Sequence, residues 1–535
     1  MDGEEDESYR NASRHNTRRR FGFNGPDNRQ RASTSPATTF WSSSSSGISQ
    51  MLRKGLGSAV GRALHISSRA KSTASSSKLV SELPPPRLDY KSIAENVDAK
   101  IHNAQIRAAP IPQEDIRTVS KLYNEAKEVS KQLNFQRHQQ SQIGERIRKA
   151  ANEEERAKAK QEAAALKQQV HELQASLQQL EQTYQAYALH IPNDTHPQSP
   201  VGPEPSAVTL EVCRPNTEPA DPKRDHVAIA KELDLLDLES GATVTGSSWY
   251  FLKNEAALLE MALSNYSMAV AIKHGFTPVT TPDVVRSDVA VRCGFQPRDQ
   301  AASHMYHLTK NHETAPQLIL SGTAEIPLAG MFANKVYQQA ELPLKYVGIG
   351  HAFRQEAGAR SADTRGLYRV HQFTKVELFA VTDAEGSEEM MEKMKDIQIE
   401  ILRDLNLSFR VLDMPTEELG ASAYRKYDIE AWMPGRGTWG EVTSLSNCTD
   451  YQSRRLHIRY RPQLKDKDAG DSRLPFAHTL NGTGAAIPRL IVALLENGAR
   501  FSEDGKVEKL QLPSVLEPFW PPMMKDRICW QTREY

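Results

Sequence analysis

The sequence has no long apolar run, few cysteines and no surplus of charge of either sign. No stretch approaches the roughly 18 consecutive apolar residues of a membrane-spanning helix, so we expect no membrane partner. The four cysteines lie far apart and form no CxxC pair. They indicate neither a disulfide framework nor a zinc site, and they are compatible with a reducing compartment. Lys and Arg together number 67 and Asp and Glu also number 67, so the net charge gives no indication of a nucleic-acid partner.

The length and composition of the chain favour a protein with more than one domain. At 535 residues the chain exceeds the size of one ordinary domain, which predicts two folded units with additional tails. Its 39% hydrophobic and 25% charged residues are typical of a soluble globular protein that can bury a large core.

The N-terminal region contains a basic segment that begins at a methionine. Residues 51–77 carry five Lys or Arg residues and no acidic residue, and they are rich in Ser, Ala and Gly. This composition is typical of a mitochondrial transit peptide, which we predict within residues 51–87 together with a linker. The alternative is an ordinary Ser- and Arg-rich disordered tail. Since the chain starts with the acidic MDGEEDE, we hypothesise that Met51 is the true or an alternative initiator, and residues 1–50 are predicted to be a disordered extension.

Two helical tracts with regularly spaced apolar residues follow. Apolar residues recur every three or four positions over 116–133 and again over 166–187, which is the spacing of a coiled-coil seam. The simplest structure is an antiparallel helical hairpin whose arms of ~35 residues reach roughly 50 Å. A dimerisation coiled coil and a solvated helical linker are the alternatives. Prolines and a glycine within 191–202 end the pattern, so we predict a helical domain over 88–195 and a linker over 196–224.

The remaining residues, 225–535, read as an α+β domain. Apolar runs at 342–353, 370–381 and 407–414 are typical of strands, and residues 255–275 are typical of a helix. The strands and helices do not alternate strictly, and neither a GxGxxG nor a GxxxxGK[ST] phosphate loop is present. This organisation favours a catalytic domain built on a largely antiparallel sheet over a doubly wound parallel one.

Three patches of this second unit carry residues suited to chemistry. In LSGTAEIPLAG, Thr323 and Glu325 are two residues apart and would share one face of a strand, where they could bind an ammonium group. In the segment from Phe353 to Phe379, arginines suited to phosphate lie beside a Gly- and Arg-rich loop, and Glu377 lies in an apolar strand where a carboxylate needs a partner. Residues 478–498 read as a strand, a glycine turn and an apolar helix that bears Arg489. Each patch alone has an ordinary structural explanation, namely a half-exposed strand, a charged hairpin or a salt bridge.

Taken together, the patches resemble the signatures of class II aminoacyl-tRNA synthetases. The subtype resembles seryl-tRNA synthetase through TAE, FRQEAGA, DTRGL, HQFTKVE, EVTSLSNCTDYQSRR and LNGTG, and the resemblance spans about residues 88–520. It implies an N-terminal helical hairpin that binds tRNA, followed by a class II catalytic domain. It also implies a serine–tRNA ligase that activates L-serine with ATP to seryl-adenylate and transfers the seryl group to tRNA-Ser.

The resemblance also implies roles for individual residues. The residues implied to act in catalysis are Arg354, Glu441 and Arg489. Those implied to bind serine are Thr323, Ala324, Glu325, Glu377 and Thr483. Those implied to bind ATP are Arg354, Gln355, Glu356, Val370, His371, Gln372, Phe373, Glu441, Val442, Thr443, Ser444 and Arg489. Glu441 and Ser444 would also hold Mg²⁺ with the ATP.

Further expectations concern partners, location and competing functions. GFTPVTTPDVV at 275–285 resembles the signature that packs across a twofold axis, which implies a homodimer. The basic residues predicted at the tip of the hairpin suit the phosphates and riboses of tRNA-Ser. We expect a role in mitochondrial translation in the matrix, and an additional cytosolic form stays open. The competing hypotheses are a non-catalytic synthetase-like protein and a ligase that charges a carrier protein. The first should lack charged signature residues and the second should lack a complete arm.

Overall fold

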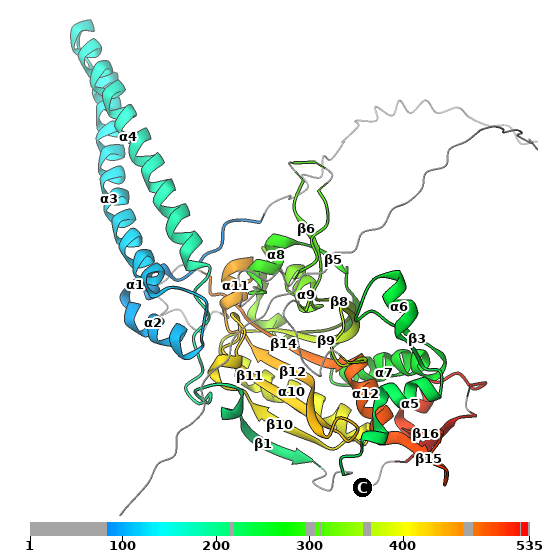
Figure 1. Cartoon of the computed structure of the whole chain (residues 1–535). Helices are drawn as coiled ribbons and strands as arrows, with labels where there is room; N and C mark the ends of the chain where they lie inside the picture. Colours follow the sequence, from blue (N-terminus) through cyan, green and yellow to red (C-terminus); the bar gives the residue numbers. More distant parts are fainter. Residues whose placement is uncertain are drawn as a thin grey trace, which may run out of the picture. The chain divides into compact units, whose positions relative to one another are not determined.

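The computed structural model describes residues 83–213, 219–295, 305–310, 312–313, 315–356, 365–463, 474–524 and 526–532 (Figure 1). The predicted extension at 1–50 lies outside the described residues, as does the predicted transit segment up to residue 82.

The first described elements form a helical hairpin. The short helices α1 (Tyr90–Glu95) and α2 (Val97–Ile106) precede the long helices α3 (Gln113–Lys149) and α4 (Glu153–Ala188), which pair along their length (Figure 1). Apolar residues of the predicted seam, among them Val119 and Leu133 of α3 and Leu166 of α4, are buried. The side chain of Asn152 accepts a hydrogen bond from the Glu155 amide at 2.8 Å and caps α4. The predicted antiparallel hairpin is confirmed.

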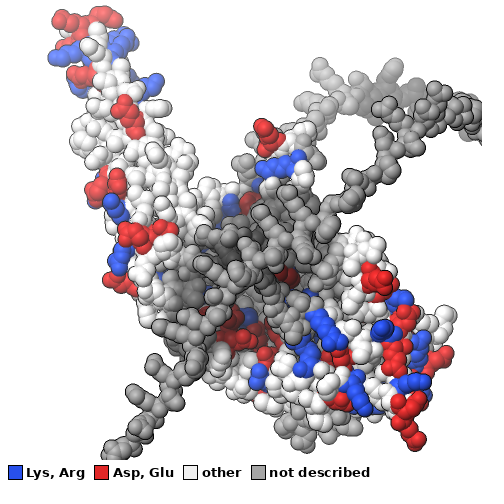
Figure 2. All heavy atoms as spheres, viewed as in Figure 1, with Lys and Arg blue, Asp and Glu red and all other residues white. Residues whose placement is uncertain are grey.

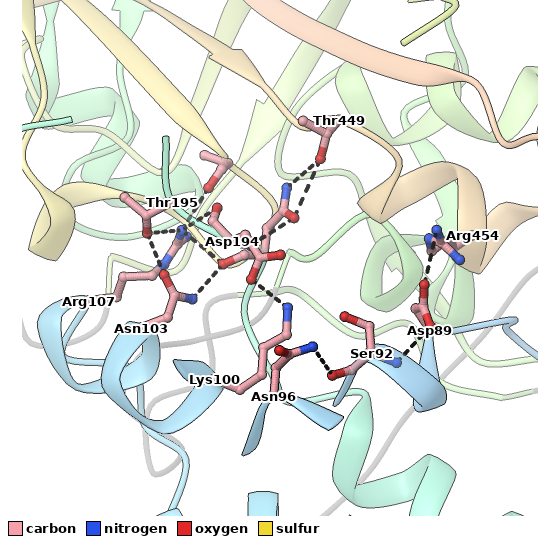
Figure 3. A network of polar contacts seen from close by, with 12 residues as sticks. Asp89, Ser92, Asn96, Lys100, Asn103, Arg107, Asp194, Thr195, Thr449 and Arg454 are labelled. Atoms are coloured by element: carbon pink, nitrogen blue, oxygen red, sulfur yellow. Dashed lines mark hydrogen bonds and ion pairs between the residues drawn. The ribbon is translucent and has the colours of Figure 1, made fainter. Parts of the chain in front are cut away.

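Polar contacts join the base of this hairpin to the following domain (Figure 3). The buried guanidinium of Arg107 donates to the carbonyl oxygens of Gly420 at 2.5 Å and Ala423 at 2.9 Å. The side chain of Asn193 donates to the carbonyl oxygens of Ser422 and Cys448, both at 2.9 Å. These bonds satisfy backbone groups that would be costly to bury unpaired.

The second domain is built on an eight-stranded sheet (Figure 1). All neighbouring strands pair antiparallel except β4 and β8, which are parallel. The predicted α+β fold on a largely antiparallel sheet is therefore confirmed. In spatial order the strands are β1 (Val208–Cys213), β10 (Phe409–Asp413), β11 (Arg425–Met433), β12 (Thr438–Asn447), β14 (His478–Ala486), β9 (Gln372–Thr382), β8 (Leu344–Phe353) and β4 (Thr277–Thr280). The edge strand β1 lies inside the segment predicted to be a linker.

Helices pack on both faces of the sheet. The alternating residues of β9 explain how: Val376, Leu378 and Ala380 join one apolar cluster, whereas Phe379 and Val381 join another. The first cluster includes residues of α5 (His226–Glu232), α7 (Asn254–Lys273), α10 (Ser387–Asp404) and α12 (Ile487–Gly498). The second includes residues of α8 (Ser287–Arg292), α9 (Glu325–Met331) and α11 (Tyr451–Leu456). Because both faces of β9 are covered, any charged side chain on this strand needs a buried partner.

Smaller elements complete the described part of the domain. They are helix α6 (Leu238–Val244) and the strands β2 (Leu236–Asp237), β3 (Phe251–Leu252), β5 (Val284–Arg286), β6 (Leu318–Leu320), β7 (Val336–Gln338), β13 (Arg459–Arg461), β15 (Ala499–Phe501), β16 (Val507–Pro513) and β17 (Ile528–Gln531). Within the described ranges no helix is both long and apolar enough to cross a membrane. All four cysteines are free.

Two local predictions were wrong. Thr323 and Glu325 do not share a strand: β6 ends at Leu320, Thr323 lies in the following turn, and Glu325 begins α9. The glycines of LNGTG do not form a turn either, because β14 runs through them to Ala486. Instead, the pairing of β14 with β9 shifts by one residue between Thr483 and Ala485, which leaves Gly484 at a bulge.

Candidate active site

Side chains from three strands, one helix and two connecting segments line a cavity at the surface of the sheet. Its walls come from β9, β12 and β14, from the start of α12, and from the residues that directly follow β8 and precede β9. The lining residues are Arg354, Glu356, Tyr368, Arg369, Val370, Phe373, Lys375, Glu441, Val442, Thr443, Ser444, Thr483, Ala486, Pro488 and Arg489.

Arg354 follows β8 and is held by backbone groups. Its Nε donates to the carbonyl oxygen of Gly322 at 3.2 Å, and its own amide donates to the carbonyl oxygen of His371 at 2.9 Å. The guanidinium lies over the ring of Phe373, 5.4 Å from the ring centre. Burial lowers the pKa of Arg354, while the carboxylate of Glu356 opposes this shift. A buried guanidinium in this position is suited to a multiply charged anion.

Arg489, in the first turn of α12, closes the opposite wall. It forms an ion pair of 3.1 Å with Glu441 of β12 and donates through Nε to the carbonyl oxygen of Tyr368 at 3.2 Å. The ring of Tyr368 lies beneath the guanidinium at 4.7 Å. Burial disfavours the charged form of Glu441, but Arg489 and Lys426 outweigh it and lower the pKa of this carboxyl. The cavity therefore presents a fixed cation and an ionised carboxylate together.

A buried cluster of charges lies at the inner end of the cavity. Lys375 and Glu377 are two residues apart on β9 and form an ion pair of 2.5 Å, with side chains 10% and 1% exposed. The hydroxyl of Thr323 donates to Glu377 at 3.0 Å, and Lys375 donates to the same hydroxyl at 3.3 Å. The ladder places Thr483 of β14 directly beside Glu377. Lys375 is thus the partner that the buried carboxylate of Glu377 needs.

Glu325 is held in the same region by two amides. One of its oxygens accepts from the side chains of Gln452 at 2.6 Å and Asn481 at 3.0 Å. Burial, followed by the negative charge of Glu377, raises the pKa of Glu325 to about 7. A carboxyl in this state binds a cation when it is ionised and is neutral in mildly acidic solution.

Side-chain bonds join β12 to β14 along the cavity floor. The hydroxyl of Thr443 donates to the carbonyl oxygen of Thr483, and the hydroxyls of Ser444 and Thr483 lie 3.4 Å apart. From beneath, the buried amide of Gln398 donates to the carbonyl oxygens of Ser444 and Thr483, both at 2.9 Å. These contacts keep the two hydroxyls at a fixed position.

The structure brings most, but not all, of the predicted site residues to the cavity. Ten of them line it: Arg354, Glu356, Val370, Phe373, Glu441, Val442, Thr443, Ser444, Thr483 and Arg489. Thr323 and Glu377 lie behind Lys375, and Glu325 lies near them, while Ala324 is buried beside Thr323. Gln355, His371 and Gln372 do not line the cavity. Gln355 donates to the carbonyl oxygen of Met305, and a ring nitrogen of His371 lies 3.0 Å from the carbonyl oxygen of Arg354.

Sequence reasoning missed Lys375, Tyr368 and Arg369, which also line the cavity. A signal for Lys375 existed, because a residue two positions before Glu377 on a strand points to the same face. Arg369 pairs with Glu356 at 2.8 Å.

Comparisons with known proteins were made against family models, curated proteins and solved structures. Residues 88–195 match the model "Seryl-tRNA synthetase N-terminal domain", and residues 306–498 match "tRNA synthetase class II core domain (G, H, P, S and T)". The chain is 40% identical over 437 residues to "Serine--tRNA ligase" of Treponema denticola, covering 81% of this chain and 98% of the relative. It is 41% identical over 436 residues to "Serine--tRNA ligase, mitochondrial" of Schizosaccharomyces pombe, covering 81% of this chain and 88% of the relative.

A solved structure is also similar over most of the chain. It is that of a seryl-tRNA synthetase from Pyrococcus horikoshii complexed with ATP, with a TM-score of 0.71 and 33% identity. The match covers 81% of this chain and 98% of that one.

Proposed function

Because the chain belongs to the seryl-tRNA synthetases and is a serine–tRNA ligase, we propose that the cavity between β8, β9, β12 and α12 binds ATP and L-serine and forms seryl-adenylate. One observation carries this proposal. The cavity joins two fixed arginines, Arg354 and Arg489, to the buried cluster of Lys375, Glu377 and Thr323. The arginines suit the phosphates of ATP, and the buried cluster suits a small polar amino acid.

Serine would lie at the inner end of the cavity. Thr323, Ala324 and Glu325 would surround its ammonium group, and Glu377 with Thr483 would receive its hydroxyl. Alanine would leave Glu377 buried without that hydrogen bond, so the site would reject alanine strongly. Threonine keeps the hydroxyl, so its extra methyl must be excluded by steric fit.

ATP would fill the outer part of the cavity. Arg354 would contact the α-phosphate and Arg489 the distal phosphates, where their positive charge suits the anion. The segment from Val370 to Phe373 would frame the adenine, with the Phe373 ring stacked on it and Glu356 at its edge. Gln355, His371 and Gln372 would act through backbone and neighbouring contacts, as would Val442 and Thr443 of the cavity floor.

The chemistry then needs no protein nucleophile. The serine carboxylate attacks the α-phosphorus in line, the bond to the β-phosphate oxygen breaks, and pyrophosphate leaves. Arg354 would stabilise the charge that develops on the α-phosphate, and Arg489 the charge on the leaving pyrophosphate. A hydroxyl of the terminal ribose of tRNA-Ser subsequently attacks the acyl carbon of the adenylate and releases AMP.

Magnesium is a further part of the proposal. Glu441 and Ser444 offer a carboxylate that stays ionised and a hydroxyl on one strand, and oxygen donors are what Mg²⁺ prefers. Among the described residues no group of three or more His, Cys, Asp or Glu side chains is arranged so that it could hold a metal ion by itself. The residues therefore fit an ion that is held mainly by the ATP phosphates and water, and such an ion neutralises phosphate charge. Glu441 would divide its contacts between this ion and Arg489.

The helical hairpin would bind tRNA-Ser. Lysines and arginines mixed with glutamates cover its far end (Figure 2). Arg146 pairs with Glu162 at 2.9 Å, so part of this charge has a partner within the arm. The exposed basic side chains at the tip would contact phosphates and riboses, which positions an RNA without reading its sequence. We further propose a homodimer through the segment 275–285.

A mitochondrial role is the last part of the proposal. It is supported by the basic segment at 51–77 and by the mitochondrial relative from S. pombe, although the bacterial relative is equally similar. A fluorescent protein fused to residues 1–87 should reach the mitochondrial matrix, and the fusion that starts at Met51 should do so as well. Cytosolic fluorescence from both fusions would contradict this role.

The function of the cavity is tested by serine-dependent exchange between ATP and pyrophosphate, followed by charging of mitochondrial tRNA-Ser. We expect exchange with serine and none with alanine or threonine. Exchange without charging would indicate another acceptor, whereas well-folded protein without exchange would contradict the proposal.

A further inference from the structure

A buried polar network that the proposed chemistry does not use lies behind the ATP cavity. It centres on His226, the first residue of α5, and Glu496, near the end of α12, whose side chains are 4% and 0% exposed. Nδ1 of His226 lies 2.9 Å from one carboxylate oxygen of Glu496. The other oxygen accepts from the amides of Gly435 at 2.8 Å and Arg436 at 3.1 Å. A carboxylate that is fully enclosed and has three donors is a fixed point of the fold.

These contacts fix the tautomer of His226. Glu496 can only accept when ionised, so Nδ1 carries the proton. The opposite ring nitrogen, Nε2, is then an acceptor, and the backbone amide of Leu367 donates to it at 3.3 Å. The neutral ring therefore connects α12 to the segment around Leu367.

The segment 365–369 precedes β9 and is held by two contacts. Arg365 forms an ion pair of 2.5 Å with Asp225, and the amide of Leu367 is bound by His226. Between them, Gly366 has φ of +67°, and a Cβ at this position would lie 2.2 Å from Nε2 of His226. Only glycine lets the backbone approach the ring so closely.

The residues directly after Leu367 build the ATP cavity. The carbonyl oxygen and the ring of Tyr368 hold Arg489, and Arg369 pairs with Glu356. His226 therefore binds the residue directly before Tyr368, whose carbonyl group orients Arg489. His226 itself does not line the cavity.

The geometry points to His226 as a positioning residue for ATP: its Nε2 fixes the segment 365–369, so that Tyr368 and Arg369 hold Arg489 and Glu356 in place. This inference rests on the proposed ATP site. Since a misplaced phosphate contact weakens binding of the nucleotide and not of the amino acid, loss of this acceptor should raise KM for ATP and leave KM for serine unchanged.

Two substitutions of His226 separate its two hydrogen bonds. Asparagine reaches the position of Nδ1, so His226→Asn keeps the donor to Glu496 and removes the acceptor for the Leu367 amide. Glutamine reaches the position of Nε2, so His226→Gln keeps that acceptor. We expect KM for ATP in the exchange reaction to rise about tenfold in His226→Asn, which corresponds to about 1.4 kcal/mol, and to change less than about twofold in His226→Gln. His478→Asn is the matched control, because its ring bonds to Ser387 away from the cavity.

Equal values of KM for ATP in the two variants would overturn the inference. So would a parallel rise of both KM values with a lower melting temperature, since this is what a merely structural role predicts. Gly366→Ala tests the same contact from the loop, in case His226→Asn does not fold, and an unchanged KM for ATP would count against the inference.

Hydrogen exchange of the ligand-free protein distinguishes failure of this inference from failure of the proposed function. The amides of 365–369 should exchange faster in His226→Asn than in the wild type and in His226→Gln. If the wild-type protein shows no serine-dependent pyrophosphate exchange, the proposed function fails. The hydrogen-exchange measurement still tests whether His226 fixes the segment 365–369. If the wild type is active and the amides do not respond, the inference fails alone.

Discussion

The raised pKa of Glu325 predicts that serine activation depends on pH. Burial and the charge of Glu377 raise this pKa to about 7. If Glu325 binds the serine ammonium, only its ionised form contributes. Its ionised fraction falls from roughly nine-tenths at pH 8 to roughly one-tenth at pH 6, so kcat/KM for serine should fall about tenfold over this range. The serine ammonium loses its proton only at higher pH and adds no slope below pH 7.

The assay is pyrophosphate exchange at saturating ATP between pH 5.5 and 8.5. Glu325→Gln is nearly isosteric and cannot ionise. At pH 8 it should lower kcat/KM for serine by about 10- to 100-fold, since a hydrogen bond to a charged group contributes about 1.5–3 kcal/mol. It should also flatten the profile. A flat wild-type profile, or a slope that persists in Glu325→Gln, would refute the reasoning.

The same raised pKa makes the ligand-free protein less stable as the pH rises, whereas serine activation should increase. The folded-state pKa of Glu325 lies above its usual value, so the folded state binds more protons than the unfolded state between pH 4.5 and 7. The free energy of unfolding should therefore decrease as the pH rises through this window, by up to about 3 kcal/mol. Urea unfolding at pH 5 and pH 7.5 measures the change, and Glu325→Gln should reduce it.

Three further substitutions test separate parts of the structure. Glu377→Gln should lower kcat/KM for serine by on the order of 100-fold through loss of a charge-assisted bond, and equal selectivity over alanine in variant and wild type would contradict this. Arg489→Lys should raise KM for ATP about tenfold, because a lysine cannot bond to both Glu441 and the Tyr368 carbonyl as the guanidinium does; an unchanged KM would count against the assigned role. Arg107→Met removes the donors to the carbonyl oxygens of Gly420 and Ala423 at the base of the arm and should reduce tRNA-Ser charging far more than pyrophosphate exchange. Equal losses in both assays would contradict this prediction, because the substitution would then disturb the cavity as much as the arm.

The large elements of this fold could be predicted from the sequence because their patterns are long. The apolar spacing over 116–133 and 166–187 specifies two helices, and the apolar residues of 370–381 specify the strand that carries Glu377. Over such lengths the helical and strand periods differ clearly.

The short signals failed for physical reasons. The alternation of Thr323 and Glu325 covers three residues, which is too short to distinguish a strand from a turn that leads into a helix. The glycines of LNGTG indicated a turn because glycine is common in turns, but glycine in a strand can also permit close packing. A Cβ on Gly482 would lie 3.1 Å from Leu445 and 3.2 Å from Gln398, so this glycine lets α10 and β12 approach β14.

The charges around the proposed serine site explain why a lysine lies beside its carboxylates. Glu325 and Glu377 together would carry two negative charges in a buried volume, and their repulsion is one cause of the raised pKa of Glu325. Lys375 offsets one of these charges through its pair with Glu377, and it lowers the pKa of Glu325. The ionised cluster then has a net charge of one negative unit, which matches a single ammonium group. In the proposed site Glu377 would then receive the serine hydroxyl while Glu325 binds the ammonium group, because Lys375 is paired with Glu377 and favours the ionised form of Glu325.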